Sequence, residues 1–572
     1  MFNVGATPGR SGALSFGTSH SNGKYYDHLG SHDAHKDHTQ VATDAPHVET
    51  GSVVGGSYTD ATNSRYGRDH FVYKLGDKGE PVSVYAADLT TIEGGTPTSD
   101  SPAIRARPEA LAAIGSDVFV QGVYYGKLTF PNAKAGGNIE LVNSNTADQS
   151  GFYDLWVAKL DMSTTPPSAA WVVSPGDFQV KTRGAGIAVT AAGHVLTFHD
   201  DEKAKNGVVT KYSGVDGAVV WEKNFGKAIA TFRDTKMSTS GEKVYLTGSF
   251  KGKDSTTYAP ALATMTSCDD GEKVSAVVAE FDVAPADGPV AKWVTNIGCG
   301  GSKYGAKGTF IEGDFLYVVG ESSEASVVPH VATSTAAACT MTGELGGFLV
   351  KLNKADGKCV WAKDLGAAKR VVANAVSVWT MYSDDDPYKF DAEHIVKPAD
   401  RDVIMGRFDA SNGVGLWGSL VGGPARDYAY DMDMTPTGPV TVGYSKSDSL
   451  TVGAVTATNL QNQAASAVKA GDVGHYAMFA MQLSTTDVAP ACLTCGAGGD
   501  LLSATVNANK CYADGQCIDR DSFSTANPCF RCDPDTADKS LTKVLDNHCF
   551  LDGKCIAKDF PRPAFKSYNT NR

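Results

Sequence analysis

The sequence lacks a long apolar run and a block of basic residues. No stretch of 18 or more apolar residues occurs, so we expect no transmembrane segment in this chain. The net charge is −13, with acidic and basic residues mixed along the chain. Because a phosphate backbone is bound by clustered Lys and Arg, nucleic acid is not an expected partner. The first residues, MFNVGATPGRSG, have neither a basic nor an apolar segment, so no secretory signal is visible.

The short motifs of common catalytic sites are also absent. A nucleophile elbow, an H-E-x-x-H zinc motif, a phosphate-binding loop and a sialidase-type Asp box do not occur. No N-x-[ST] sequence occurs either, so N-glycosylation is not expected. The sequence therefore predicts no catalytic residue, and no cofactor other than a calcium ion.

Glycine, in contrast, is abundant. The chain has 61 glycines, with 42% hydrophobic and 20% charged residues, which is typical of a turn-rich globular protein. One phrase recurs, an aromatic residue followed by four residues and a glycine. Its copies are YYDHLG, WVVSPG, WEKNFG, WVTNIG, WAKDLG and WGSLVG, and a weaker copy, YAADLT, starts at Tyr85. Such a repeat predicts a recurring supersecondary unit.

Further strands precede this phrase in each unit. An alternating segment comes directly before most copies, as in LWVAKL, VVTKY, VVAEF and FLVKL, and turns such as GVDG, KADG and ASNG join the two strands into a hairpin. A third strand, such as DVFVQG or PVTVG, and a less regular fourth lie upstream. A repeated four-stranded unit predicts an all-β fold, a β-propeller of seven blades.

The last blade lacks its outer strand in the linear sequence. HYAMFAMQL, at residues 475–483, has no aromatic-x4-Gly strand after it, whereas KYYDHLG stands alone near the start of the chain. We expect the N-terminal strand at residues 22–30 to complete the last blade and close the ring, which removes exposed sheet edges. The propeller domain is then expected at residues 1–488.

GGPARDYAYDMDMTPTGPVTVGYSKSD, at residues 422–448, resembles the seven-bladed β-propeller repeat family. The resemblance covers residues 20–484 and implies the fold, but no catalytic site. KYSGVDGAVVWEKNFG and KLNKADGKCVWAKDLG also resemble the tryptophan-docking repeats of quinoprotein dehydrogenases. That family implies eight blades, a quinone, calcium and adjacent cysteines, and this chain has no Cys-Cys pair. We therefore expect these tryptophans to pack against the neighbouring blade.

Eight of the 12 cysteines follow residue 490. CYADGQCIDRDSFSTANPCFRC has the spacing C-x5-C-x11-C-x2-C, and CFLDGKC and CLTC repeat its head and its tail. This pattern resembles the tandem Cys-rich modules of large extracellular proteins. We expect residues 489–572 to form disulfide-linked repeats that break off after half a unit; zinc held by two C-x2-C pairs is the alternative. The cysteines are Cys492, Cys495, Cys511, Cys517, Cys529, Cys532, Cys549 and Cys555.

The other four cysteines lie in the fourth and fifth expected blades. Their positions next to hairpin strands favour two local disulfides, Cys268 with Cys299 and Cys339 with Cys359. Free buried thiols are the alternative for these four residues.

Two polar clusters are weak candidates for metal binding. His32, His35 and His38 could bind a transition metal through imidazole, although a solvated loop explains them as well. A run of acids in YSDDDPYKFDAEH offers oxygen ligands for calcium but lacks the EF-hand spacing, so it is equally explained as an acidic loop. These acids are Asp384, Asp385, Asp386, Asp391 and Glu393.

Together these features predict a noncatalytic structural, adhesive or binding protein, secreted or on a cell surface. A propeller offers variable loops to partners, and a Cys-rich stalk serves as a spacer or assembly element. The expected partners are other extracellular proteins, a second copy of the chain, or glycans. The alternatives are an extracellular propeller enzyme, as a quinone or metal oxidoreductase or a glycan hydrolase, and a carbohydrate-binding lectin.

Overall fold

The computed structural model of the chain describes its strands and many of the turns between them. Within the described part every regular element is a β-strand, and none of it is a helix that could cross a bilayer. The described residues are 2–7, 10–16, 20–21, 24–25, 40–42, 53–59, 68–75, 81–90, 105–125, 127–132, 137–142, 154–175, 186–201, 206–224, 236–250, 274–300, 305–321, 339, 341, 346–366, 368–384, 388–389, 395–396, 402–435, 438–445, 447, 449–452, 455–458, 477–483, 493–494, 505–506, 510–513, 516–519, 530–531, 543–544, 548–551 and 554–557.

The chain forms two compact units. The larger unit is Met1–Asn3 with Ala13–Gln482, and the smaller unit is Val4–Gly12 with Leu483–Arg572. The division after Gln482 lies near the boundary that we expected after residue 488.

Four sheets of the larger unit have four antiparallel strands that lie side by side in chain order. The first has β9 (Arg105–Ile114), β10 (Asp117–Tyr125), β13 (Asp154–Asp161) and β14 (Ser168–Val173). The second has β15 (Gly186–Val189), β16 (Val195–Asp201), β17 (Asn206–Tyr212) and β18 (Val219–Asn224). The third has β19 (Lys236–Ser240), β20 (Lys243–Phe250), β21 (Val274–Asp282) and β22 (Val290–Gly300). The fourth has β23 (Gly305–Glu312), β24 (Phe315–Glu321), β25 (Gly347–Asn353) and β26 (Cys359–Leu365).

Other sheets repeat this pattern and add strands at the outer edge. The sheet of β5 (Gln40–Ala42), β6 (Val53–Thr59), β7 (Arg68–Leu75) and β8 (Pro81–Thr90) is extended by β11 (Lys127–Asn132) and β12 (Gly137–Val142). The sheet of β27 (Arg370–Ala373), β28 (Ser377–Asp384), β31 (Asp402–Asp409) and β32 (Gly415–Gly422) is extended by β35 (Ser449–Val452) and β36 (Val455–Thr458). Neither hairpin was predicted from the sequence. A separate short hairpin joins β29 (Tyr388–Lys389) to β30 (Ile395–Val396).

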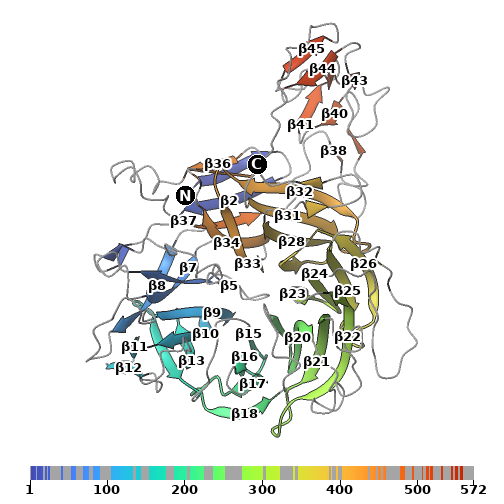
Figure 1. Cartoon of the computed structure of the whole chain (residues 1–572). Helices are drawn as coiled ribbons and strands as arrows, with labels where there is room; N and C mark the ends of the chain where they lie inside the picture. The colour runs from blue at the N-terminus through green and yellow to red at the C-terminus, as the bar shows by residue number, and fades with distance from the viewer. Residues whose placement is uncertain are drawn as a thin grey trace, which may run out of the picture. The chain divides into compact units, whose positions relative to one another are not determined.

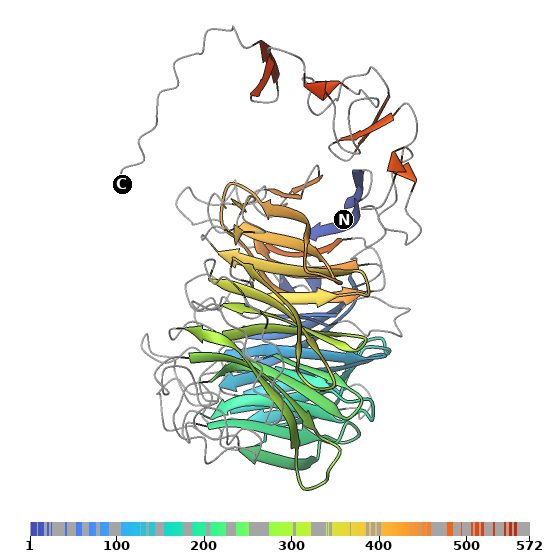
Figure 2. The same cartoon turned by 90° about the vertical axis from the view of Figure 1, so that its right-hand side faces the viewer.

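The innermost strands of successive sheets contact one another. Contacts join β5 to β9, β9 to β15, β15 to β19, β19 to β23, β23 to β27, β27 to β33 (Asp427–Thr435) and β33 back to β5. Figure 1 shows these sheets following one another around a common centre, and Figure 2 shows them from the side. An all-β architecture of four-stranded antiparallel sheets is confirmed.

The last sheet contains strands from both ends of the sequence. Its order is β1 (Phe2–Thr7), β2 (Arg10–Phe16), β37 (Ala477–Leu483), β34 (Gly438–Ser445) and β33. The strand beside β37 is therefore β2, and our assignment of that place to residues 22–30 is wrong. Within that range β4 (Lys24–Tyr25) pairs with β3 (His20–Ser21) instead. Pairing at a sheet edge uses backbone groups alone, so it does not require the aromatic-x4-Gly phrase on which our assignment rested.

Glycine near the end of the second strand, as in VTVG (residues 440–443) and YVVG (residues 317–320), permits a close approach of the backbone. A Cβ atom at Gly443 in β34 would collide with the carbonyl oxygen of Tyr428, and one at Gly320 in β24 with the carbonyl oxygen of Gly305. The innermost strand bulges at these places, between Ala306 and Gly308 in β23 and between Ala429 and Asp431 in β33. The glycine in this motif therefore marks the position where the bulge of the first strand brings its backbone close to the second strand.

The core lies between neighbouring sheets, and third strands such as β13 and β25 are buried on both faces. Leu155, Trp156, Val157 and Ala158 of β13 are all fully buried, as are Phe348, Leu349 and Val350 of β25. This double burial explains why segments such as LWVAKL and FLVKL are almost continuously apolar. Each large apolar side chain buried in this way contributes roughly 1.5–3 kcal/mol.

The smaller unit contains short two-stranded sheets. They pair β38 (Leu493–Thr494) with β39 (Thr505–Val506), β40 (Lys510–Ala513) with β41 (Gln516–Asp519), β42 (Phe530–Arg531) with β43 (Lys543–Val544), and β44 (His548–Leu551) with β45 (Lys554–Ala557).

Candidate functional site

The sheets from β9 to β33 have two unlike ends. Short turns join the first strand to the second and the third to the fourth, as at residues 115–116, 241–242, 313–314 and 354–358. The connections from the second strand to the third leave from the opposite end and include the long segments 251–273, 322–346 and 446–476. We call these the short-turn end and the loop end. Antiparallel order alone places them at opposite ends of each sheet.

The short-turn end carries a contact between neighbouring sheets that is built around tryptophan. Trp361 in β26 donates from Nε1 to the carbonyl oxygen of Ala410, 3.2 Å away, in the turn that follows β31. Lys351 lies opposite Trp361 in the sheet, and its Nζ donates to the same oxygen at 2.8 Å. Gly413 in that turn has φ +74° and faces the indole, and a Cβ there would lie 2.9 Å from the ring. We call this arrangement the tryptophan lock.

The lock recurs at Trp171, which donates to the carbonyl oxygen of Gly214 at 3.2 Å and packs on Gly217, while Lys159 donates to the same oxygen at 3.3 Å. Trp293 donates to the carbonyl oxygen of Lys354 at 3.1 Å and packs on Gly357, but Glu280 lies opposite it in place of a lysine and accepts from the same Nε1 at 3.0 Å. At Trp221 the following turn contains Pro285, and no hydrogen-bond partner of its Nε1 lies among the residues that the structure describes. Trp171, Trp293 and Trp361 therefore join neighbouring sheets, as expected from the sequence.

The loop end carries an ion pair and a hydrogen bond that together link three successive sheets. Arg370 of β27 pairs with Asp431 of β33 at 2.8 Å, and its Nη1 donates to the carbonyl oxygen of Lys307 in β23 at 3.2 Å. Lys307 itself pairs with Glu321 at 3.5 Å. Lys307 is the extra residue of the β23 bulge, and Asp431 directly follows the β33 bulge. We call these four residues the inner polar cluster.

Two buried carboxyls also lie at the loop end. Asp427 and Asp402 are 0% and 1% exposed and begin β33 and β31. Oδ2 of Asp427 accepts from the backbone N–H of Gly423 and from Ser447 Oγ, both at 2.8 Å. Burial, with a smaller contribution from the charge of Asp402, raises the pKa of Asp427 to about 6.

The sequence did not single out either group. The pairing of Arg370 with Asp431 joins residues of different sheets, which strand periodicity cannot foresee. A sequence signal for Asp427 was present, because this residue lies shortly after the glycine pair Gly422-Gly423 in the segment that resembles a family repeat.

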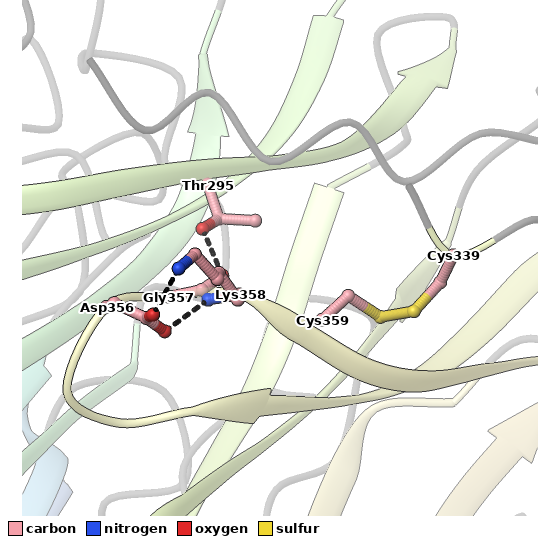
Figure 3. Close-up of a disulfide and its surroundings, with 6 residues drawn as sticks. All are labelled: Thr295, Cys339, Asp356, Gly357, Lys358 and Cys359. Carbon is pink, nitrogen blue, oxygen red and sulfur yellow. Dashed lines mark hydrogen bonds and ion pairs between the residues drawn. A yellow bond between two sulfur atoms is a disulfide. The ribbon is translucent and has the colours of Figure 1, made fainter. Parts of the chain in front are cut away.

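One disulfide is present among the described residues, between Cys339 and Cys359, whose Cα atoms are 6.0 Å apart. This is the pairing that the sequence favoured. Figure 3 shows it beside the turn at Asp356 and Gly357, where Thr295 Oγ1 donates to the carbonyl oxygen of Gly357 at 2.8 Å. Cys339 lies in the long connection 322–346 and Cys359 begins β26, so the bond fixes one point of this connection to the outer strand.

The structure describes only some of the other candidate residues. Among the described residues no group of three metal-binding side chains occurs. Asp384 ends β28 opposite Asp402, Cys299 lies in β22, and Cys511, Cys517, Cys549 and Cys555 lie in strands of the smaller unit. His32, His35, His38, Asp385, Asp386, Asp391, Glu393, Cys268, Cys492, Cys495, Cys529 and Cys532 lie outside the described residues. Metal binding and the Cys268–Cys299 pair stay predictions.

No protein-family model and no curated protein matches this sequence. Solved structures with a similar fold include the Dos1 propeller, 10% identical, covering 78% of this chain and 92% of its own, with a TM-score of 0.37. Another is the β-propeller domain of the Trilobed protease from Pyrococcus furiosus, 9% identical, covering 62% and 95%, with a TM-score of 0.30. A europium-containing methanol dehydrogenase is 11% identical, covers 75% and 89%, and has a TM-score of 0.33. These structures are similar in fold alone, and their activities say nothing about this chain.

Proposed function

We propose that this chain is a noncatalytic building block of an extracellular assembly, in which a closed seven-bladed propeller presents its loop end to partners. One observation carries the proposal: from β9 to β33, the connections at the short-turn end are tight turns that pack on tryptophans of neighbouring sheets, whereas the long connections leave from the loop end. Loops held by a rigid scaffold are where binding surfaces usually form. The inner-strand contacts from β33 to β5 and the place of β2 beside β37 support closure of the ring.

The burial of the polar groups supports a binding role over a catalytic one. The charge of Asp402 acts on Asp427, as in an acid pair, but both carboxyls are fully covered by protein. A general acid must come within hydrogen-bonding distance of its substrate, and these carboxyls cannot. Arg370 and Asp431 neutralise each other. We assign both groups to holding the sheets in register at the loop end.

The disulfide supports an oxidising location. Cys339–Cys359 lies in the larger unit, outside the Cys-rich tail, and disulfides of this kind persist in secreted and cell-surface proteins. A chain of this charge and composition is compatible with that location, and the tail would then act as a spacer or an assembly element.

Lysine cross-linking of the native assembly, followed by mass spectrometry, tests the proposal. Lys251 and Lys253 lie in a long connection at the loop end, whereas Lys358 lies in a short turn and is 44% exposed along its side chain. We expect cross-links to partner proteins from Lys251 and Lys253, and none from Lys358. Partner cross-links confined to Lys358 would overturn the assignment of the loop end.

A further inference from the structure

The contact between the third and fourth sheets differs from the Trp361 lock. Glu280 is fully buried and lies opposite Trp293, at the position that a lysine occupies in the Trp361 lock. Its Oε1 pairs with Lys243 at 2.7 Å. A carboxylate accepts hydrogen bonds, so Glu280 does not donate to the carbonyl oxygen of Lys354 as a lysine would. The single N–H of Trp293 is instead shared between that oxygen at 3.1 Å and Glu280 Oε2 at 3.0 Å.

A disulfide lies at this same contact. Cys359 directly follows the turn at residues 354–358 on which Trp293 packs, and it is bonded to Cys339 in the connection 322–346. Figure 3 shows the bond beside this turn. The bond therefore attaches a point of the connection next to the turn that joins the two sheets.

Met341, two residues after Cys339, is buried between the two sheets. It is 8% exposed and belongs to the apolar cluster that contains Trp293 of the third sheet and Phe348 of the fourth. Cys339 and Cys359 are half-buried and pack against the same cluster. The disulfide and Met341 are thus two neighbouring attachments of the connection, one covalent and one apolar.

The bonded point lies far from the place where the connection rejoins the sheet. Cys359 lies opposite Leu352, at the short-turn end of β25, whereas the connection returns to β25 at Gly347, at the loop end. Residues 347 and 352 are five positions apart, which is about 17 Å along a strand. Breaking the disulfide therefore removes the covalent attachment that holds Met341 at this distance from Gly347.

We propose that the Cys339–Cys359 bond is a redox-sensitive strap between the connection and the fourth sheet. While the bond is intact, it keeps Met341 in the cluster between the third and fourth sheets. When the bond is reduced, Met341 leaves the cluster and this contact loosens. No described disulfide lies at Trp171 or Trp361, so we expect those locks to stay closed. The inference is independent of the proposed function, because it concerns how two sheets are held together.

The strap opens by thiol–disulfide exchange with an external dithiol. A thiolate of the dithiol attacks one sulfur and the S–S bond breaks, and the second thiol of the dithiol then completes the exchange. Two electrons and two protons pass to the protein, so Cys339 and Cys359 end as thiols and the dithiol ends as a disulfide. The half-burial of both cysteines leaves the bond open to a small reductant.

Oxidation of Met341 by hydrogen peroxide tests the strap, because burial protects a thioether from conversion to the sulfoxide. The full chain is compared with a Cys339→Ala/Cys359→Ala variant, in which the cysteines of the tail are unchanged. We expect Met341 to be oxidised about tenfold faster in the variant, as measured by mass spectrometry of its peptide. Met405 of β31 is fully buried and serves as the internal control, with the same oxidation rate in both proteins.

Reduction of the folded chain tests the redox sensitivity. The protein is treated with a dithiol, alkylated and digested, and near-UV circular dichroism follows its tertiary structure. We expect Cys339 and Cys359 to be alkylated together while the fold is retained, and amide hydrogen exchange in β26 to become faster. The same treatment should leave the exchange of β26 in the double variant unchanged, which separates this bond from any bond in the tail.

Three results would overturn the proposal. Equal oxidation rates of Met341 in the two proteins would show that the bond does not hold this residue. Faster oxidation of Met405 as well as Met341 would show that the bond stabilises the whole unit and not one contact. A bond that resists the dithiol until the chain unfolds would be a fixed crosslink and not a switch.

Discussion

The two ends of the sheets use different residues to hold neighbouring sheets together. At the short-turn end, an indole, a lysine and a left-handed glycine meet at one backbone carbonyl, as at Trp361, Lys351 and Gly413. At the loop end, paired charges such as Arg370 and Asp431 and buried carboxyls such as Asp427 link the sheets. The first arrangement depends on a tight turn and repeats in the sequence. The second depends on residues brought together by the fold, and it leaves the adjoining connections free to vary in length.

Trp361→Ala should give the largest effect on the short-turn end. The variant loses the indole that packs on Gly413 and the hydrogen bond to Ala410, and we expect the free energy of unfolding to fall by about 3–5 kcal/mol. Trp221→Ala removes a more deeply buried indole, but no hydrogen-bond partner of its Nε1 lies among the described residues, so we expect it to cost less. Urea denaturation of both variants measures the difference. Equal losses would show that packing alone, and not the lock, joins the sheets.

Carboxyls at the two ends should respond to pH in opposite directions. The pKa of Asp427 in the folded protein is about 6, above its ordinary value of about 4, so folding favours its protonated form. Its contribution to stability is therefore fully present below pH about 4 and is lost as the pH rises to about 6, a difference of about 3 kcal/mol. We expect Asp427→Asn to remove this pH dependence from urea denaturation curves measured between pH 4 and 7.

Asp282 at the short-turn end is the matched control. Its pKa is lowered, mainly because its carboxylate accepts a hydrogen bond from the backbone N–H of Ala284. Its contribution is present above its ordinary pKa and is lost as the pH falls, the reverse of Asp427. If Asp427→Asn and Asp282→Asn change the pH dependence in the same direction, the contrast between the two ends is wrong.

Gly413→Ala should give a smaller effect that separates backbone strain from contact with the ring. A Cβ at Gly413 meets both a positive φ and the indole of Trp361, whereas Gly241 has φ +64° with no atom within 4 Å of its Cβ position. We expect about 1 kcal/mol of destabilisation for Gly241→Ala and about 2–3 kcal/mol for Gly413→Ala. Thermal unfolding compares the two variants. A loss no larger at Gly413 than at Gly241 would mean that the ring does not rest on the turn.

The sequence predicted what depends on local residues. Asp-Gly and Asn-Gly turns, the recurring tryptophans and the Cys339–Cys359 pair all follow from neighbours in one hairpin or one sheet. Residues 22–30 were assigned wrongly to the last sheet because edge pairing needs only an extended backbone, which RSGALSF at residues 10–16 supplies equally well. The Arg370–Asp431 pair joins strands of different sheets, and the residue pattern within either strand does not predict that contact.

The structure of the protein purified from its native source, with its neighbours retained, tests the division between the two ends most directly. Our account predicts that neighbouring subunits or partners contact the connections of the loop end, such as residues 251–273 and 446–476, and leave the tryptophan locks untouched. A neighbour seated on the short turns at residues 213–218 and 354–358 would contradict it. So would a free monomer with a small molecule bound beside Arg370 and Asp431, which would favour an enzyme.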